Sequence, residues 1–435
     1  MANQKIIPFS VETKDVVFVK PSKPTPSTVL SLSTFDNNPE LNILCQTIYV
    51  FKPNPNHGQP EPDPSCVIKE ALSKVLFFYY PLAGKLKSHS DGKLRVNCDA
   101  SGVPFLEATA NCELSSLHYV DFDDGIDVIE TTKNLIFNYA SEDENSGHHP
   151  LVLQVTKFLC GGFTLGMGLS HSVCDGFGAS QFFRAMAELA SGKDEPSVKP
   201  VWERERLVGT ILKEPIKFPF ELTSSAASPF WPSSQLSYQF FNVKGAYVWR
   251  ARARAMKLNS EGETLFCLTI GARRILDPPL PDGYYGNAFV GANLVLKVKE
   301  LEERPLYEVV KLIKQSKKAA LNNDYIRNSI NMMETMRETN VGIGKTGSST
   351  VLTDWRQLGL LEEMDFGWKS PVNIVPSPRN MFGYVDLCLF LPPSNLDAEM
   401  KGGVRVYLSL PEAAMPMFRE EMEKLEHIGE DDGGI

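Results

Sequence analysis

The part of this chain that most constrains its fold is residues 151–190, where two apolar runs precede a helix-forming segment. LVLQVTKFLCGGFTLGMGLSH at 151–171 predicts two strands joined at Gly161-Gly162. After them, ASQFFRAMAELASG predicts a helix that ends at Gly192 and carries one apolar stripe, formed by Phe182, Met186, Leu189 and Ala190. His171 is therefore expected where a strand ends and a helix is about to begin.

Strands and helices alternate along the rest of the chain as well. SCVIKEALSKVLFFYY at 65–80 predicts a helix, and DGKLRVNCDASGVPFLEATA after it predicts a hairpin with turns at Asp91-Gly92 and Ser101-Gly102. In the second half, helices are predicted at AYVWRARARAMKL, 303–321 and 411–426, and strands at TLFCLTIGARRI, 350–353 and 385–391. This alternation is typical of an α/β protein.

The length and composition suit more than one domain. With 435 residues, 43% of them hydrophobic, the chain can form roughly two or three domains of about 150 residues. Between 191 and 235 the periodic pattern gives way to polar and Pro/Ser-rich sequence, which is typical of a linker. We therefore expect one domain at 1–190, a crossover linker at 191–235 and a second domain at 236–435.

Charge, termini and cysteines exclude several classes of protein. The formal net charge of −9 argues against nucleic acid as a partner, because binding phosphates requires a basic surface. MANQKIIPFS lacks the features of a signal peptide, and the longest apolar run, at 75–84, is shorter than the roughly 18 residues of a membrane span. The eight cysteines are scattered without a CxxC pair, which suits a reducing cytosol. We expect a cytoplasmic protein that binds no membrane.

His171 and Asp175 form a His-x-x-x-Asp pattern. The pattern is weak by itself, because His427 and Asp431 repeat it near the C-terminus. Only His171 follows an apolar strand and precedes glycines that let the backbone approach a ligand closely. A working base in a cleft and a histidine that caps a turn would both give this pattern, so spacing alone leaves both interpretations open.

Asp175 admits three roles on the same evidence. It could orient His171 as the acid of a triad, ligate a metal with it, or pair with an arginine and hold the loop. His148 and His149 lie in a polar loop and supply no further ligand at a suitable spacing, so no metal is expected. Cys174 could be a nucleophile, but single cysteines are more often small buried hydrophobes.

Three further stretches resemble sites of other kinds. Gly344-Lys345-Thr346 matches the end of a phosphate-binding loop, but Thr339 stands where the earlier glycine is required. Asp365-Phe366-Gly367 spells the kinase metal-binding tripeptide without the rest of the kinase signature. WRARARAM at 249–256 is either a solvated helix face or a place where Arg252 and Arg254 meet an anionic cofactor.

Taken together, ordered motifs along the chain resemble the BAHD family of plant acyl-coenzyme A-dependent acyltransferases. The resemblance rests on HSVCDG at 171–176 and DFGW at 365–368. Supporting motifs occur in the family's order: LSTFD at 32–36, YYPLAGKL at 79–86, CGGF at 160–163, PVWERE at 200–205, WRAR at 249–252 and PPLPDGYYGN at 278–287.

The resemblance implies a fold and a set of site residues. The fold would be two similar-sized α/β domains, each a mixed β-sheet flanked by helices as in chloramphenicol acetyltransferase, with a solvent channel between them. His171 would be the general base, while Asp175 would point away from the reaction and pair with Arg273. Structural roles near the site would fall to Gly176, Asp365 and Gly367, and the Trp368 indole would lie near the developing oxyanion.

The implied reaction is direct acyl transfer in a monomeric enzyme of plant specialised metabolism. Acyl-coenzyme A would be a co-substrate, and no cofactor would be bound permanently. His171 would take a proton from an acceptor amine or hydroxyl as that atom attacks the thioester carbonyl, and would then return the proton to the departing thiolate. A neutral imidazole with a pKa near 6.5 suits this role at cytosolic pH.

The chain departs from the family pattern in two places. Lys369 stands where the last glycine of DFGWG is expected. Between 235 and 256 about 20 residues are missing by comparison with the pattern, so the second domain is expected to be shortened near residue 240. A shortened second domain would make a catalytically impaired binding relative the alternative to an active enzyme.

The motifs favour an amine acceptor and an aromatic acyl donor. TDWRQLGLLEEMDFGWKSPVNIVP and MFGYVDLCLFLPP look similar to members that acylate spermidine with hydroxycinnamoyl groups. The N-terminal half is equally similar to members that acetylate or benzoylate alcohols, including taxane-type acceptors. Glu362 and Glu363 could face a polycation, although acidic residues in such a turn are more often solvated.

Overall fold

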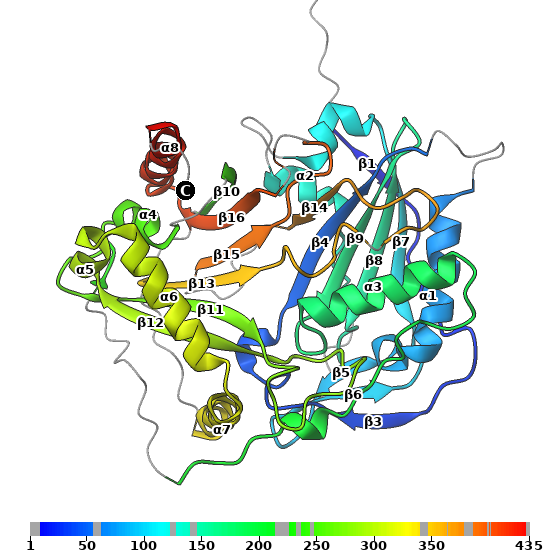
Figure 1. The fold of residues 1–435 in the computed structure, drawn as a ribbon. Helices are drawn as coiled ribbons and strands as arrows, with labels where there is room; N and C mark the ends of the chain where they lie inside the picture. The colour runs from blue at the N-terminus through cyan, green and yellow to red at the C-terminus, as the bar shows by residue number, and fades with distance from the viewer. Residues whose placement is uncertain are drawn as a thin grey trace, which may run out of the picture.

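The computed structural model describes residues 9–54, 62–121, 128–139, 146–213, 226–231, 236–243, 248–339, 347–362, 364–377, 386–397, 400 and 402–431. These residues form two large mixed β-sheets, one of seven strands and one of six, with helices packed against both (Figure 1). The predicted α/β fold with two mixed sheets is confirmed.

The first sheet contains the strand that leads to His171. Its order is β1-β7-β8-β9-β4-β14, with β2 also paired to β7, and only β7 and β8 run parallel. The strands are β1 (Val11–Thr13), β2 (Val17–Val19), β4 (Leu44–Phe51), β7 (Val103–Ala110), β8 (Leu151–Lys157), β9 (Phe163–Ser170) and β14 (Asn373–Pro376). Every residue of β9 is buried, as expected for a strand covered on both faces.

Two helices pack together over one face of this sheet (Figure 1). These are α1 (Pro64–Phe78) and α3 (Gly176–Ala190). The helix α1 begins with Asp63, whose side chain accepts a hydrogen bond from the Ser65 N–H, followed by proline at the first helical position. Of the predicted stripe on α3, Phe182, Met186 and Leu189 are buried in the core that the helix shares with the sheet.

The second sheet has the order β10-β16-β15-β13-β11-β12. Its strands are β10 (Leu236–Val243), β11 (Glu263–Gly271), β12 (Phe289–Lys297), β13 (Ser349–Asp354), β15 (Asp386–Leu391) and β16 (Val404–Pro411). Its helices are α4 (Val248–Ala255), α5 (Val298–Glu303), α6 (Leu306–Ala320), α7 (Asn323–Thr339) and α8 (Met415–Asp431). The last helix thus begins later and runs further than the predicted 411–426. A remaining helix, α2 (Val128–Leu135), contacts β8 and β9 of the first sheet.

The predicted hairpin after α1 is wrong. The strands β5 (Lys85–Ser88) and β6 (Leu94–Cys98) form the hairpin instead, and with β3 (Thr28–Ser31) they make a separate three-stranded sheet. The Asp91-Gly92 turn lies in that hairpin, whereas Ser101-Gly102 leads the chain from β6 across to β7 in the first sheet. Both connections carry turn residues, so local sequence does not distinguish a hairpin from a crossover.

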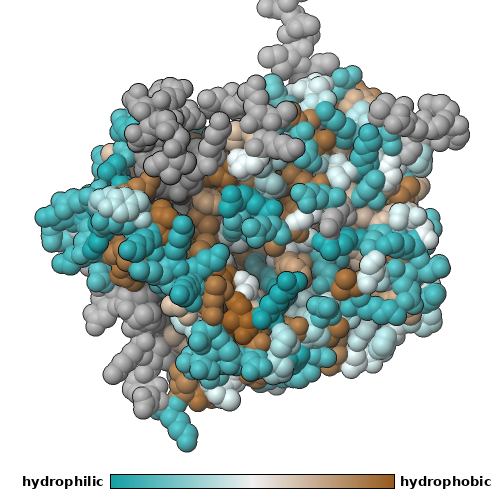
Figure 2. All heavy atoms as spheres, in the orientation of Figure 1, coloured by the Kyte–Doolittle hydropathy of each residue, from teal (hydrophilic) through white to brown (hydrophobic). Residues whose placement is uncertain are grey.

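The second half of the chain contributes a strand to the first sheet. The strand β14 pairs antiparallel with β4 over Asn373–Pro376, so these residues of the predicted second domain belong to the first sheet. Arg405 of β16 ties the two sheets together, because its guanidinium donates hydrogen bonds to the Ile374 carbonyl at 2.7 Å and the Asp121 carboxylate at 2.8 Å. Apolar side chains gather along the seam between the two halves (Figure 2).

No helix in the described part of the chain is long and apolar enough to cross a membrane.

Candidate active site

His171 follows directly after β9, at the end of the strand where the sequence predicts it. Its backbone N–H donates to the Ile43 carbonyl at 2.9 Å, which fixes the residue next to the start of β4. The residue is partly accessible, whereas its neighbours Ser172, Val173 and Cys174 are buried. The imidazole is therefore the group of this loop that can meet a substrate.

Asn287 determines which nitrogen of His171 carries the proton. The Asn287 amide nitrogen donates to the His171 carbonyl at 2.6 Å and to Asp36 Oδ1 at 2.7 Å, so both of its hydrogens are used. Asn287 Oδ1 then faces His171 Nδ1 at 3.0 Å. Because an amide oxygen only accepts, neutral His171 must be protonated at Nδ1, which leaves the lone pair of Nε2 available as a base.

A buried ion pair lies behind Asn287. The Asp36 carboxylate also accepts hydrogen bonds from the Asn287 and Ser33 backbone N–H groups, both at 3.1 Å. Arg204 Nε lies 3.2 Å from Asp36 Oδ2, and both side chains are almost completely buried. Arg204 also donates to the Val173 carbonyl at 2.8 Å, which attaches it to the loop that carries His171.

Asp175 faces away from the His171 ring, toward Arg273. Two parallel hydrogen bonds of 2.7 and 2.8 Å join the carboxylate to the Arg273 guanidinium, the pairing that the family resemblance implies. The same carboxylate accepts from the Gly178 N–H at 2.9 Å, which caps the start of α3, and from the Ala288 N–H at 3.1 Å. Burial opposes ionisation of Asp175, but Arg273 and these donors outweigh it, so the pKa lies below its usual value.

Burial lowers the pKa of His171 below its ordinary value of 6.5. Weaker opposing contributions come from its own backbone, from the Asp175 charge and from Asn287. Since the neutral form is favoured, His171 is suited to accept a proton throughout the neutral range.

An aromatic surface borders His171. The Phe289 ring lies 5.9 Å from the imidazole, measured between ring centroids, and remains partly accessible. On its other side it stacks on the buried Phe35 ring at 6.2 Å with an interplanar angle of 20°. Phe289 therefore presents a flat apolar surface beside the proposed base.

Trp368 packs at the end of β9 opposite to His171, and its contact with the oxyanion stays a prediction. Its indole is buried against Phe163 at the first residue of β9, with a centroid distance of 5.3 Å. His171 follows the last residue of that strand, and seven residues at about 3.3 Å each separate its two ends. The indole is held there by the apolar core that Phe51, Phe163 and Phe366 share, which accounts for its distance from His171.

Asp365, Gly367 and Gly176 shape the backbone around loops. Asp365 is exposed and accepts from the Gly367 N–H at 2.7 Å, in a turn where Gly367 has a positive φ of 103°. Lys369 also adopts a positive φ, 64°, at the position where the family has glycine. Gly176 opens α3, and a side chain there would lie 2.8 Å from Leu358 Cδ1.

The two arginines of α4 have partners within the second domain. Arg252 is almost completely buried and donates to the Gly347 carbonyl at 2.7 Å. Arg254 pairs with Glu421 of α8 at 2.8 Å. Both guanidinium groups contribute to packing of the domain, so a contact of Arg252 or Arg254 with an anionic cofactor stays a prediction and would require displacing these partners.

The remaining candidates have structural surroundings. Burial raises the pKa of the Cys174 thiol well above its ordinary value, so the thiolate needed for a nucleophile is disfavoured. Within the described ranges, no three His, Cys, Asp or Glu side chains form a group that could hold a metal ion. Glu362 is exposed on a turn. Glu363 and Gly344-Lys345-Thr346 lie outside the described residues.

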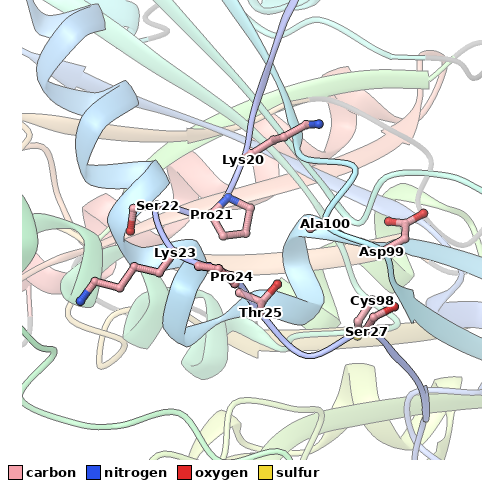
Figure 3. A pocket seen from close by; sticks show the side chains of 10 residues that line it. All are labelled: Lys20, Pro21, Ser22, Lys23, Pro24, Thr25, Ser27, Cys98, Asp99 and Ala100. Carbon is pink, nitrogen blue, oxygen red and sulfur yellow. The ribbon is translucent and has the colours of Figure 1, made fainter.

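A surface hollow of about 410 Å³ lies apart from these residues (Figure 3). Its lining comes from two segments, 20–27 and 98–100, and does not include His171, Asn287, Asp175 or Arg273. The hollow is open and lined mostly by lysine, proline and serine side chains. It therefore lacks the convergent polar groups that are typical of a catalytic pocket.

Sequence reasoning identified His171, Asp175 and Arg273 but assigned no role to Asn287, Asp36 or Arg204. These three residues do lie inside motifs that carry the resemblance, namely YYGN, LSTFD and PVWERE. The N-cap role of Asp175 was also missed, although an aspartate followed by a helix is a recognised signal.

A family model described as Transferase family matches residues 9–238 and 221–425. The chain belongs to this family. The match confirms the resemblance to the BAHD acyltransferases, and the transferase is an acyl-coenzyme A-dependent acyltransferase.

Similar curated proteins extend over nearly the whole transferase. It is 40% identical to a spermidine coumaroyl-CoA acyltransferase of Arabidopsis thaliana over 98% of this chain and 99% of the relative. Identity to a spermidine sinapoyl-CoA acyltransferase of the same organism is 41% over 97% and 98% of the two chains. A 3'-N-debenzoyl-2'-deoxytaxol N-benzoyltransferase of Taxus canadensis is 32% identical over 96% of each.

Solved structures share the fold of the transferase. Vinorine synthase superposes with a TM-score of 0.73 at 20% identity, covering 96% of this chain and 98% of that structure. A protein of F. sporotrichioides, TRI101, solved with coenzyme A and T-2, superposes with a TM-score of 0.66 at 18% identity, covering 92% and 99%.

The comparisons also bear on the missing segment. The alignment with the coumaroyl-CoA relative extends over 462 positions, more than the 435 residues of the chain, so the transferase lacks residues that this relative has. The family model matches in two stretches that overlap at 221–238, next to the position where the segment is missing by the motif pattern. Even so, β10 pairs with β16 along all eight of its residues, and α4 packs on α8.

Proposed function

We propose that this transferase moves a hydroxycinnamoyl group from coenzyme A to an amine of a spermidine-like polyamine, with His171 as the general base. The observation that carries the proposal is the identity of 40 and 41%, over nearly the full chain, to two acyltransferases whose names specify spermidine and a hydroxycinnamoyl-coenzyme A. The taxane relative, at 32%, is less similar.

The proposed mechanism uses the Nε2 lone pair of His171. The acceptor nitrogen attacks the thioester carbonyl carbon while Nε2 removes one of its protons, and a tetrahedral intermediate forms. The intermediate then expels the thiolate of coenzyme A, which takes the proton back from the imidazolium, so that amide and free coenzyme A are the products. General base catalysis contributes about 10²- to 10⁴-fold, and positioning of the two substrates contributes much of the rest.

Phe289 supports an aromatic acyl group. A hydroxycinnamoyl chain is flat and apolar along its ring, and the partly accessible Phe289 ring offers a stacking surface beside His171. Because the ring rests on the buried Phe35, it has a rigid backing.

Thiol release in a substrate panel tests the proposal. Purified protein is mixed with p-coumaroyl-, benzoyl- or acetyl-coenzyme A and with polyamines or alcohols, and His171→Ala is assayed alongside. We expect the highest kcat/KM with p-coumaroyl-coenzyme A and spermidine, and a loss of at least about 10²-fold in His171→Ala. Turnover that survives this substitution would rule out His171 as the base. His118→Ala, which removes a histidine of the segment Leu114–Val120, is the control for protein quality.

Two other outcomes correspond to alternative functions. Preferred turnover of an alcohol would make the protein an O-acyltransferase. The missing segment favours a third possibility, a catalytically impaired binding relative, which would release no thiol from any pair and would bind no acyl-coenzyme A.

We also propose that the enzyme acts in the cytosol as a monomer within plant specialised metabolism, with acyl-coenzyme A as its co-substrate and no resident cofactor. The scattered cysteines, all present as thiols, support a reducing compartment. Size-exclusion chromatography with light scattering tests the monomer, and a fluorescent fusion in plant cells tests the compartment.

A further inference from the structure

We propose that Asp36 and Arg204 are positioning residues for His171: their buried ion pair orients the Asn287 amide, and that amide selects the His171 tautomer with Nε2 as the base. The inference rests on the proposed function of His171. The central measurement is which ring nitrogen of His171 carries the proton. Because this measurement needs no turnover, a failure of the inference and a failure of the proposed function give different results.

The ion pair of Asp36 and Arg204 lies in the protein interior. Asp36 and Asn287 are completely buried, and Arg204 is 1% exposed. Removing two charges from water costs several kcal/mol per ion, and a well-packed apolar pair of similar size is often equally stable. Stability alone therefore gives no reason for an ion pair beneath this loop.

The hydrogen bonds of the Asn287 side chain can run in only one direction. A carboxylate has only acceptors, so Asp36 can face only the NH₂ side of the Asn287 amide. With the amide reversed, Asn287 Oδ1 would oppose both Asp36 Oδ1 and the His171 carbonyl, the two oxygens that now accept at 2.7 and 2.6 Å. Asp36 thus holds Asn287 Oδ1 toward His171 Nδ1, which must then carry the proton.

Arg204 holds the carboxylate in turn. Its guanidinium carbon lies 4.3 Å from the Trp202 ring centroid, 5.0 Å from that of Tyr284 and 4.8 Å from that of Tyr285. Gly286 gives it room, since a Cβ there would lie 1.3 Å from Nη1. The segment Tyr284–Asn287 therefore encloses Arg204 and delivers the Asn287 side chain to His171.

Asp36→Asn is the decisive substitution. The new amide has one oxygen and one NH₂ group in place of two oxygens. The Arg204 cation and the Ser33 N–H both favour an oxygen at the Oδ2 position. Together they outweigh the Asn287 backbone N–H, a single neutral donor to Oδ1, so the new NH₂ group turns toward the Asn287 side chain. Asn287 is then driven to reverse, and its own NH₂ group donates to Nδ1, so that the proton of His171 moves to Nε2.

The tautomer is read by two-bond ¹H–¹⁵N correlation spectra of protein labelled with ¹⁵N-histidine, at a pH where the ring is neutral. His171 is identified among the seven histidines by the signals that His171→Gln removes. We expect the Nδ1–H form in the wild type and a gain of the Nε2–H form in Asp36→Asn. The kcat should fall by about 10²-fold or more, with KM for acyl-coenzyme A within about twofold. Asp15→Asn, at an exposed aspartate between β1 and β2, is the matched control and should retain both the tautomer and kcat.

Asn287→Ala is the second variant, because it leaves Asp36 in its ion pair with Arg204 and hydrogen-bonded to the Ser33 N–H. We expect a mixture of tautomers and a kcat reduced by about 10-fold or more. If Asp36→Asn does not fold, a mixed tautomer in Asn287→Ala supports the inference, whereas the native tautomer in that variant overturns it. Native tautomer and native kcat in folded Asp36→Asn overturn it as well. Loss of activity in Asp36→Asn with the Nδ1–H form retained would assign Asp36 a purely structural role.

Discussion

At the scale of single residues, the environments of His171 and Asp175 separate two groups that stand only four positions apart in the sequence. His171 has a pKa lowered by burial and faces Asn287, so its neutral form is suited to the proposed role of base. Asp175 is ionised and engaged by Arg273, Gly178 and Ala288, so it does not orient the imidazole as a triad acid would.

The pH dependence of kcat/KM is predicted to identify the acceptor class. Activity should fall as the pH drops through the pKa of His171, which lies below 6.5, because protonation removes the base. Above that pKa, kcat/KM for an alcohol should reach a plateau. For an amine with a pKa near 10 it should keep rising by roughly tenfold per pH unit, since only the free amine attacks. A profile with spermidine that is flat from pH 7 to 9 would contradict proton loss from a cationic amine.

Asp175→Asn is predicted to destabilise the fold. Removing one partner of a buried ion pair leaves Arg273 uncompensated and costs about 3–5 kcal/mol, measurable by urea unfolding at neutral pH. Because the folded-state pKa of Asp175 is lowered, its stabilisation is present above the unfolded-state pKa near 3.8 and is lost as the pH falls through the folded value. Wild type and variant should therefore converge in acid. Asp365→Asn is the control, and an equal effect there would remove the special role of Asp175.

At the scale of elements, the start of α3 sets the position of the loop that bears His171. Asp175 caps the helix, and the first turn lies against the segment that contains Asn287. A Cβ at Gly178 would approach the Tyr285 carbonyl oxygen to 1.9 Å, so the close contact between helix and segment depends on glycine. Two elements distant in the sequence thus meet behind the loop that bears His171.

Gly178→Ala is predicted to displace α3 from Tyr285. We expect a loss of about 1–3 kcal/mol from overpacking, together with a reduced kcat because Tyr285 precedes Asn287 by two residues. Gly271→Ala is the matched control, since a Cβ there would meet nothing within 4 Å. Unfolding curves and kcat of both variants check the prediction. Identical behaviour of the two would show that the contact tolerates a side chain.

At the scale of the whole molecule, the two sheets are joined by more than a linker, because the second half of the chain contributes a strand to the first sheet. The strand β14 extends the first sheet although its neighbours in sequence belong to the second (Figure 1). Arg405 adds a buried connection to β14. Arg204, from the predicted linker, reaches the residues behind His171. The relative position of the two halves therefore affects the site directly.

Arg405→Met is predicted to weaken the connection between the sheets. Methionine keeps much of the length but cannot donate to Ile374, and losing a buried hydrogen bond from a charged group costs about 1.5–3 kcal/mol. Urea unfolding followed by tryptophan fluorescence measures the loss. Arg419→Met is the control, because Arg419 is exposed and bonds to Gln239 within the second domain. Equal stabilities of the two variants would argue against a role for Arg405 in joining the sheets.

The sequence by itself determined the order of strands and helices, the place of His171 at the end of β9, and the family. Apolar periodicity and turn residues act over a few positions, so they specify elements such as α1, α3 and the pair β8 and β9. The tertiary structure alone decided that β6 and β7 join different sheets, that β14 crosses over, and that Trp368 packs on Phe163. It also brought Asp36, Arg204 and Asn287 behind His171. These contacts join side chains more than 80 positions apart, and no local period encodes a contact between distant single residues.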